Sequence, residues 1–361
     1  MTLGLSNADA NLDSNHFVYL CGEPGSGKTE VIIYAAAQAA QTGAKVLIGC
    51  PTGSLVATYK DRLPGTESIV IETLHSAFAI RRGADASTYD APSRLRQFDL
   101  FIIDEVSQVE DSVFQLLLMA IMEMSHKPFM VLAGDFSQLQ PVSTNKKADS
   151  KTTLHEFTEK IGSITLLQHE YARSKDPILM DFLTAVRKEQ PSRRDIKLFF
   201  GARHLKSSFD KAIAFSTRLE ERTNKPVLWL TVTNAGAAKV NNAVLERLYG
   251  FGEGYLETNG YPGDTKAGAN RVVVKVGMRL RLTRNLDKDR GFVNGALGTV
   301  TQLLDKRGIV FIMQLTHGAM VLVHPIRSEN LTFLPCAYGY AMTIRCPLSA
   351  LEVMELLFFT Y

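Results

Sequence analysis

The sequence predicts an α/β protein with two domains, and three observations support this fold class. The first 166 of the 361 residues alternate short apolar runs with longer amphipathic stretches, which is typical of a parallel sheet covered by helices. A second alternating block begins near Leu166. Residues 271–325 differ from both, because they form four or five short β-type runs separated by glycine and asparagine. The chain length also suits two domains better than one.

The first domain is expected to span residues 1–166. Its predicted strands are the short apolar runs Phe17–Cys21, Lys45–Cys50, Ile69–Glu72, Leu100–Ile103, Phe129–Ala133 and Ile164–Leu167. Helices are predicted at Lys28–Gln41, with Gly43 at its C-terminal end, and at Asp111–Met124, whose first turn is acidic. Residues 78–97 interrupt the alternation with a segment rich in Arg, Ala and Ser, which indicates an insertion between sheet elements.

The second domain is expected to span residues 167–361. Helices are predicted at Asp176–Arg187 and Ala235–Tyr249, and a strand at Val227–Thr231. The β-type runs within residues 271–325 are RVVVKV, MRLRLTR, LGTVTQLL, GIVFIMQL and MVLVHPI. These runs predict a small antiparallel barrel inserted into this domain.

The composition is that of an ordinary soluble globular protein, with 45% hydrophobic and 21% charged residues. No apolar run approaches the roughly 18 residues of a membrane span, and no signal segment opens the chain. The four cysteines lack the C-x-x-C spacing of a zinc site, which favours reduced thiols. We therefore expect an intracellular protein without a membrane association, in the nucleus or, as the alternative, in the mitochondrion.

The net charge of +3 conceals an uneven distribution along the chain. Residues 1–150 contain 11 Lys and Arg against 17 Asp and Glu, whereas residues 151–361 contain 29 against 20. A basic second half can attract phosphate backbones, although a solvated basic face explains the same counts equally well.

The first chemical motif is the octapeptide GEPGSGKT, which follows a predicted strand and precedes a predicted helix. It matches G-x-x-x-x-G-K-[ST], in which glycines let backbone N–H groups surround phosphates at a helix N-terminus. The residues predicted to bind the nucleotide are Gly22, Pro24, Gly25, Ser26, Gly27, Lys28 and Thr29. Lys28 is placed for the β- and γ-phosphates and Thr29 for Mg²⁺, so ATP and Mg²⁺ are the expected ligands.

The second motif is the apolar strand Leu100–Ile103, which is followed directly by Asp104 and Glu105. Open α/β sheets bind their ligands at the carboxyl ends of their strands. Asp104 is therefore a candidate ligand of Mg²⁺, and Glu105 a candidate to orient or deprotonate the attacking water. A strand that ends in two acidic residues is common, but its position after a phosphate loop favours hydrolysis over binding alone.

The third motif is GDFSQLQPV at 134–142, which follows another predicted buried strand. Gln138 is a neutral donor in a position suited to sensing the γ-phosphate. The alternative is a glutamine that only stabilises its own loop.

These motifs together resemble superfamily-1B DNA helicases, namely the petite-integration-frequency helicases of eukaryotes and the helicase ends of Helitron transposons, with RecD as a more distant relative. The resemblance rests on the order GEPGSGKT, TLHSAF, IIDEVSQVE and GDFSQLQPV. It continues through Tyr171-Ala-Arg173, Val232–Leu248, Val276–Val300 and Leu334–Arg345, and so covers nearly the whole chain.

The resemblance implies two RecA-like lobes that bind ATP between them. It further implies that residues 78–97 are a small wedge insertion and that residues 271–325 are an SH3-like barrel. Arg173 would neutralise charge on the γ-phosphate in the transition state, with a surface arginine as the alternative. The residues implied to line a groove for single-stranded DNA are Pro51, Thr52, Thr73 and His75. A histidine such as His75 is as often a core or capping residue.

The family resemblance also implies the mode of action. Such helicases contact the backbone and stack the bases of single-stranded DNA and DNA forks, and translocate in the 5′→3′ direction. We expect this protein to act as a monomer.

Three departures from the family pattern bear on activity. Residues 1–15 contain no glutamine that would recognise adenine. The segment after Ile344 reads RCPLSA, where the family has a Gln-Gly-Thr-like string, and Pro347 would disturb a following helix. A final strand with an arginine-bearing turn is also missing. We expect an incomplete sequence to explain these differences, with degeneration as the alternative.

The sequence therefore predicts an ATP-dependent DNA helicase that serves DNA repair, recombination or telomere maintenance, or a mobile element. The alternative is a catalytically impaired remnant that binds nucleotide and DNA. A different phosphate-loop enzyme, such as a small-molecule kinase, is disfavoured by GDFSQLQPV and by the barrel-like segment.

Overall fold

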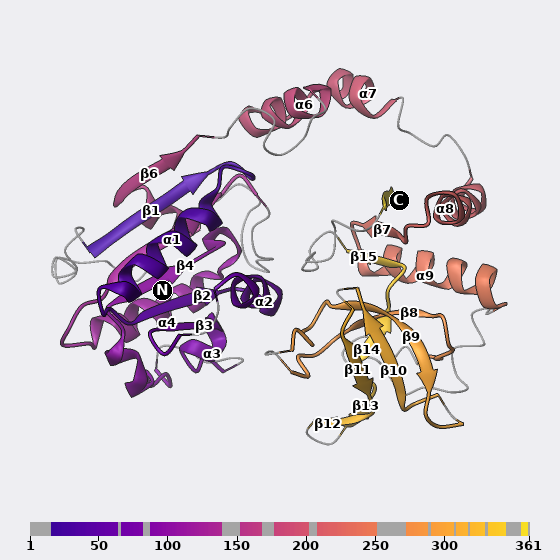
Figure 1. Ribbon diagram of the computed structural model, residues 1–361. Helices are drawn as coiled ribbons and strands as arrows, with labels where there is room; N and C mark the ends of the chain where they lie inside the picture. The colour runs from indigo at the N-terminus through magenta and orange to yellow at the C-terminus, as the bar shows by residue number, and fades with distance from the viewer. Residues whose placement is uncertain are drawn as a thin grey trace. The chain divides into compact units, whose positions relative to one another are not determined.

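Figure 1 shows the computed structural model of the protein. It describes residues 16–63, 66–81, 87–138, 152–167, 177–201, 208–250, 272–287, 290–306, 308–316, 318–328, 331–343 and 355–359. The internal contacts divide the chain into two compact units, Met1–His204 and Leu205–Tyr361.

The first unit is built on a parallel sheet, as the alternating pattern predicted. Its six described strands lie in the order β3-β2-β4-β5-β1-β6. Their bounds are β1 Phe17–Gly22, β2 Val46–Cys50, β3 Ile69–Thr73, β4 Leu100–Ile103, β5 Phe129–Gly134 and β6 Gly162–Leu166. Every one of these pairs is parallel. All five residues of β2 are buried, because a parallel sheet is covered on both faces.

Helices cover the two faces of this sheet (Figure 1). They are α1 Lys28–Gln41, α2 Gly53–Arg62, α3 Leu74–Ala77, α4 Asp111–Met122 and α5 Thr153–Thr158, with 3₁₀ turns at Ser93–Gln97 and Val106–Gln108. Ile48 faces the core that contains α1 and α2, whereas the preceding Leu47 faces the core that contains α3, α4 and α5. This alternation of faces is the strand period of two. The bounds predicted for α1 are confirmed, and α2 was not predicted.

The described parts of the excursion at residues 78–97 are anchored on the first unit. The Tyr89 hydroxyl donates a hydrogen bond of 2.9 Å to the carbonyl of Phe78. Arg94 forms two hydrogen bonds with the carboxylate of Glu72, at 2.9 and 2.8 Å. Leu95 is buried in the same core as α4. The segment therefore leaves the sheet after α3 and returns to it before β4.

Two helices, α6 Pro177–Lys188 and α7 Arg193–Gly201, follow the first sheet. The rings of Phe182 and Phe199 stack at 4.1 Å and join the two helices. Contacts place both helices with the first unit, so the structural division falls after His204. The domain boundary after residue 166 follows β6 directly and stays a prediction.

The second unit contains a parallel sheet in which β7 lies at the centre of the three strands that are described. These strands are β15 Ala341–Thr343, β7 Val227–Thr231 and β16 Glu355–Phe359. Helices α8 Phe209–Thr223 and α9 Asn234–Tyr249 belong to the same unit. The predictions for β7 and for the helix now identified as α9 are confirmed, whereas α8, β15 and β16 were not predicted.

Asn241 of α9 joins this helix to the chain that enters β15. Its side chain is 8% exposed. The Asn241 amide donates to the carbonyl of Ala341 at 3.1 Å, and its oxygen accepts the backbone N–H groups of Tyr340 at 3.1 Å and Ala341 at 2.9 Å. One buried side chain thus satisfies three backbone groups that would otherwise lack a partner.

We expect the substitution Asn241→Ala to lower the free energy of unfolding of the second unit by about 2–4 kcal/mol, because buried polar groups would lose their partners. Denaturant titration followed by tryptophan fluorescence measures this change, since Trp229 lies in the same core. Asn242→Ala, which changes the half-buried neighbour on the same helix, is the control and should change stability by less than about 1 kcal/mol. Equal effects of the two substitutions would contradict the assignment.

An antiparallel sheet completes the second unit, as the β-type runs predicted. The described strands lie in the order β11-β10-β9-β8-β14. Their bounds are β8 Arg279–Leu282, β9 Leu297–Leu303, β10 Phe311–Leu315, β11 Met320–Val323 and β14 Cys336–Tyr338, and a hairpin of β12 Ile326–Ser328 and β13 Leu331–Phe333 lies between β11 and β14 in sequence.

Two details of this prediction were wrong. The run RVVVKV does not form a strand, because residues 272–275 have no ladder partners, although Val272, Val273 and Val274 are buried in the core of the unit. A short apolar run indicates that its residues are buried, but it does not by itself distinguish a strand from buried irregular chain. The sheet also extends beyond residue 325, since β14 pairs with β8.

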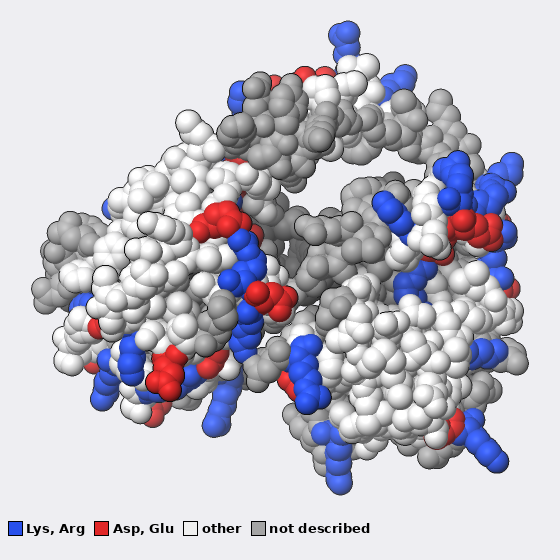
Figure 2. All heavy atoms as spheres, in the orientation of Figure 1, with Lys and Arg blue, Asp and Glu red and all other residues white. Residues whose placement is uncertain are grey.

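Charged side chains of both signs lie on the surface of each unit. In Figure 2, basic side chains are prominent on the second unit, with acidic ones among them near α8. Among the residues that the structure describes, no helix has the length and apolar character that a membrane crossing requires.

Candidate active site

The parallel sheet of the first unit gathers the predicted site residues along one edge. The strands end, from β3 to β6, at Thr73, Cys50, Ile103, Gly134, Gly22 and Leu166. The phosphate loop that follows β1 therefore lies next to Asp135 after β5, and Asp104 after β4 comes next. The predicted DNA-contacting residues follow β2 and β3, farther along the same edge.

The phosphate loop connects β1 to α1, and its glycines adopt conformations that other residues disfavour. Gly25 and Gly27 have φ angles of 84° and 88°. A Cβ atom on Gly22 would lie 2.5 Å from Oγ of Ser26 and 2.9 Å from the carbonyl oxygen of Leu166. The buried Ser26 hydroxyl has no hydrogen-bond partner within the described part of the chain. A phosphate oxygen bound by this loop would supply that partner.

Lys28 is the first residue of α1, and its side chain is 8% exposed. Its Nζ atom donates hydrogen bonds to the carbonyls of Gly22 at 2.6 Å and Glu23 at 3.2 Å, so the ammonium group lies inside the loop. Its positive charge also acts to lower the pKa of both Asp104 and Glu105. The ammonium group and the two carboxylates therefore belong to one electrostatic site.

Asp104 is held by two hydrogen bonds at the end of β4. The Tyr59 hydroxyl donates to its Oδ2 atom at 2.6 Å, and the backbone N–H of Glu105 donates to Oδ1 at 2.8 Å. Asp104 is only 3% exposed. Burial raises the pKa of Asp104, and this outweighs the two hydrogen bonds and the Lys28 charge, which act in the opposite direction.

The donor set at this point fits Mg²⁺ bound together with nucleotide phosphates. Thr29 lies close enough to Tyr59 to act on the pKa of its hydroxyl, and that hydroxyl contacts Asp104, so the Thr29 hydroxyl and the Asp104 carboxylate lie in the same region. Among the described residues, no cluster of three or more His, Cys, Asp or Glu forms a dedicated metal site. Mg²⁺ commonly binds through one or two protein oxygens together with phosphates and water, so Thr29 and Asp104 are sufficient protein ligands.

Glu105 has an unusual backbone conformation, with φ 51° and ψ 46° in the left-handed region. Such a conformation costs about 1–3 kcal/mol for a residue other than glycine and is concentrated at functional sites. Burial raises the pKa of Glu105, and the neighbouring charge of Asp104 raises it further. A carboxylate of raised basicity beside the phosphate loop is suited to accept a proton from water.

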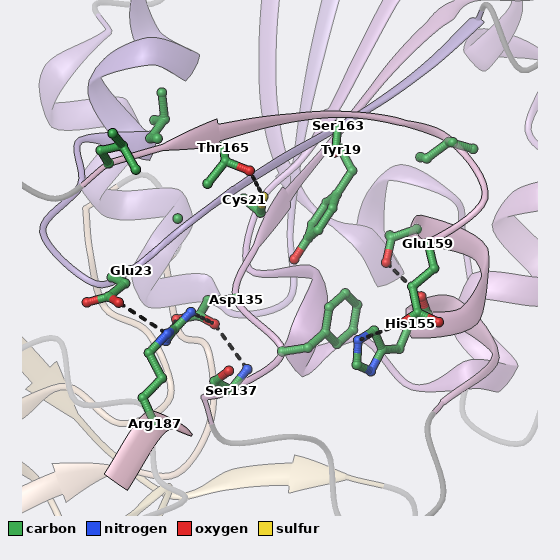
Figure 3. A pocket seen from close by; sticks show the side chains of 16 residues that line it. Tyr19, Cys21, Glu23, Asp135, Ser137, His155, Glu159, Ser163, Thr165 and Arg187 are labelled. Carbon is green, nitrogen blue, oxygen red and sulfur yellow. Dashed lines mark hydrogen bonds and ion pairs between the residues drawn. The ribbon is translucent and has the colours of Figure 1, made fainter. Parts of the chain in front are cut away.

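A network of four side chains connects the loop after β5 to the phosphate loop and to α6, and Figure 3 shows three of them, Glu23, Asp135 and Arg187. Arg187 of α6 donates two hydrogen bonds to Asp135, at 2.6 and 2.8 Å, and its Nε lies 3.3 Å from Glu23. The Gln138 amide donates to the same carboxylate at 3.3 Å. Burial alone would raise the pKa of Asp135, but the hydrogen bonds from Arg187 hold it below its ordinary value. The predicted γ-phosphate sensor is therefore fixed through Asp135.

A cavity of about 880 Å³ opens beside this network, between β1, β6 and α5. Figure 3 shows Tyr19 and Cys21 of β1 on one side and Arg187 on another. His155 of α5 stacks on Phe136 with 4.3 Å between ring centroids. The cavity is continuous with the phosphate loop, since Gly22 and Glu23 also line it.

We expect Arg187→Ala to lower the free energy of unfolding of the first unit by about 3–5 kcal/mol, because Asp135 is 3% exposed and would keep a buried charge without its bidentate partner. Denaturant titration measures the change. Arg62→Ala removes an arginine that also pairs bidentately, with Glu30, but on the exposed surface, and it should have a much smaller effect. A loss in Arg187→Ala no larger than in the control would contradict the role of the network.

The four predicted DNA-contacting residues differ from one another in their contacts and in their exposure. Thr52 and Thr73 cap α2 and α3, since their hydroxyls accept the N–H groups of the residues three positions later. Cys50 and Thr73 are paired in the sheet, which brings the two segments side by side. Pro51 is half-buried and His75 is exposed. Both threonines thus have a structural role, and the DNA contacts stay a prediction.

Two parts of the predicted site lie outside the described residues. Arg173 falls in the segment 168–176, and the final residues of the GDFSQLQPV motif fall in 139–150. The catalytic role of Arg173 therefore stays a prediction.

Sequence reasoning missed Tyr59 and Arg187, which contact two of the site carboxylates. Tyr59 lies in a helix that was not predicted, and Arg187 was expected only as the last residue of a helix. Neither belongs to a motif with a fixed spacing, so the partners of these side chains follow only from the folded chain.

Comparisons with known proteins found matches in both units of the chain. Residues 7–144 match the family model described as an AAA domain, and residues 268–303 match the model described as the 2B domain of the DNA helicase Pif1. The chain is 29% identical over 286 residues to the ATP-dependent DNA helicase PIF1 of Danio rerio, covering 72% of this chain and 43% of that relative. It thus spans less than half of the relative's length.

Solved structures share the fold. The chain superposes on Bacteroides Pif1 bound to single-stranded DNA with a TM-score of 0.62 and 20% identity, over 94% of this chain and 88% of that one. A structure of two coordinating Pif1 helicases at forked duplex DNA gives a TM-score of 0.61 and 20% identity, over 92% and 79% of the two chains. With the phosphate loop, the acidic pair after β4, the Asp135 loop and the match of the second unit to a Pif1 domain, the chain is similar to the Pif1 helicases in both of its units.

Proposed function

We propose that this protein is an ATP-dependent DNA helicase that couples ATP hydrolysis to movement along single-stranded DNA. The observation that carries the proposal is the convergence of Lys28, Asp104 and Glu105 at one edge of the sheet. At that edge β2, which Pro51 follows directly, lies beside β4. A nucleotide site and a candidate DNA-contacting surface therefore occupy neighbouring strand ends.

The residues of the site suit separate tasks in phosphoryl transfer to water. Lys28 and the N–H groups of the loop bind and neutralise the phosphates. Glu105 orients the attacking water and takes its proton, and Gln138 contacts the γ-phosphate from the Asp135 loop. Thr29 and Asp104 would hold Mg²⁺, which would neutralise part of the charge that the phosphates carry. Arg173 is the candidate for the arginine that stabilises the transition state.

The DNA substrate is proposed from the family and from the neighbouring structures, which contain single-stranded DNA and forked DNA. Pro51, Thr52, Thr73 and His75 would contact one strand, with little preference for base sequence. We infer a 5′→3′ direction, a monomeric motor and a nuclear or mitochondrial role in DNA repair, recombination or telomere maintenance from the family alone.

The second candidate function is a helicase remnant that binds nucleotide and DNA without turnover. The observation that favours it is the run RCPLSA at 345–350, which replaces the Gln-Gly-Thr-like string of related helicases. This candidate predicts that nucleotide and DNA binding are retained while hydrolysis is absent.

Strand displacement on labelled forks tests the proposed function. A fork with a 5′ single-stranded tail should be unwound in the presence of ATP and Mg²⁺, and a fork with only a 3′ tail should not. Unwinding from the 3′ tail would overturn the direction. The loss of unwinding with both tails, alongside intact binding of DNA, would favour the remnant.

A further inference from the structure

Helix α2 connects the predicted DNA-contacting segment to the nucleotide site. The proposed function requires that DNA binding at the first affects ATP hydrolysis at the second. It begins at Gly53, directly after the capping residue Thr52, and it contains Tyr59 two turns later. The capping residue lies in the predicted DNA-contacting segment. The side chain of Tyr59 reaches Asp104 on the nucleotide side. One helix thus carries both the capping residue at the predicted DNA-contacting segment and the side chain that contacts Asp104.

Tyr59 forms its hydrogen bond from a fully buried position and not on the protein surface. The whole residue is 0% exposed, and its ring lies in the core formed by α1, α2 and the sheet. Its hydroxyl donates to Asp104 at 2.6 Å, a short distance typical of a charge-assisted hydrogen bond. Burial raises the pKa of this hydroxyl, and the nearby Thr29 side chain acts to lower it. A single buried phenol therefore contacts Asp104 and lies near Thr29, the two residues that are proposed to hold Mg²⁺.

We propose that Tyr59 is a positioning residue that couples DNA contact at Pro51–Thr52 to the Mg²⁺-binding pair Thr29 and Asp104. This inference rests on the proposed function, because it specifies how the same site is regulated. Tyr59 touches neither nucleotide phosphates nor DNA in this scheme, and acts by holding Asp104 and Thr29 in one geometry.

The packing of α2 explains why a shift at one end would reach the other. Tyr59 and Val56 are buried against the sheet, so the helix cannot rotate freely. Arg62 at the end of α2 forms two hydrogen bonds with Glu30 of α1, the residue after Thr29. DNA that moves the Thr52 end of α2 would therefore shift the Tyr59 hydroxyl relative to Asp104. A hydrogen bond of 2.6 Å is sensitive to such a displacement.

The test compares Tyr59→Phe with Tyr89→Phe in the full chain. Both substitutions remove one tyrosine hydroxyl that makes a hydrogen bond, but Tyr89 bonds the carbonyl of Phe78 and lies away from the nucleotide. We expect Tyr59→Phe to weaken the binding of Mn²⁺ to the complex of protein and ADP about tenfold, as measured by electron paramagnetic resonance. We also expect the stimulation of ATP turnover by oligo(dT) to fall about tenfold, through kcat and not through KM. Tyr89→Phe should leave both quantities unchanged.

The outcomes separate this inference from the proposed function. If the wild-type chain does not turn over ATP but Mn²⁺ binding weakens only in Tyr59→Phe, the positioning role holds while the motor function fails. If the wild type is stimulated by DNA and Tyr59→Phe equals Tyr89→Phe in both measurements, the inference is overturned.

A measurement on the unmodified protein keeps the test independent of any folding defect. Hydrogen–deuterium exchange should slow in peptides covering 53–62 and 100–108 together when oligo(dT) binds. Protection of the first segment without the second would contradict the coupling.

Discussion

Replacing Lys28 with alanine is expected to lower ATP turnover by at least about 10³-fold. The Lys28 ammonium group is buried within the loop, 2.6 Å from the carbonyl of Gly22, where water cannot replace its charge. Charge stabilisation in a site that excludes water contributes more than the same charge in solution. Steady-state release of phosphate measures the loss, and a fluorescent ADP analogue reports the accompanying loss of affinity.

Lys45→Ala is the matched control for this substitution. Lys45 is exposed and precedes β2, so it lies at the opposite edge of the sheet from the phosphate loop. Its replacement should leave turnover within about twofold of the wild type. Turnover that survives in Lys28→Ala would show that the measured hydrolysis comes from another site or from a contaminating enzyme.

Replacing Glu105 with glutamine is expected to lower kcat by about 10²–10⁴-fold while nucleotide binding is retained. The amide has the shape of the carboxylate but cannot accept a proton from the attacking water. The binding of the fluorescent ADP analogue should therefore stay within a few-fold of the wild type, in contrast with Lys28→Ala. Glu110→Gln, at the exposed cap of α4, is the control and should be active.

The pH dependence of the wild-type enzyme provides a second readout of Glu105. Burial and the neighbouring Asp104 raise its pKa, so the group becomes a base only above the ordinary range of a glutamate. In a plot of turnover against pH, the rate should therefore increase at pH values above that range. This increase should disappear in Glu105→Gln. An increase that persists in the variant would assign the proton transfer to another group.

The sheet of the first unit was predictable because burial on both faces leaves a continuous apolar run in each strand. Leu100–Ile103 is such a run, and its bounds are confirmed. The phosphate loop was equally predictable, because its spacing is fixed by the geometry of the phosphates it surrounds. These signals are local, and each can be recognised within about ten residues.

The remaining features depend on contacts between segments far apart in sequence. Tyr59 meets Asp104 across 45 residues, and Arg187 meets Asp135 across 52. Helix α2 escaped prediction because it begins with Gly-Ser and contains Val and Thr, which have low helix propensity. The run RVVVKV predicts a strand because three buried valines give the same signal whether or not they pair. Tertiary packing determines each of these features, and the sequence pattern alone does not predict that packing.

The most direct test of the central claim is the steady-state rate of ATP hydrolysis by the purified chain, with and without single-stranded oligo(dT). A motor that is coupled to DNA predicts turnover that rises at least about tenfold with DNA and requires Mg²⁺ and Lys28. Turnover that is the same with and without DNA, or that is absent while DNA still binds, would contradict it.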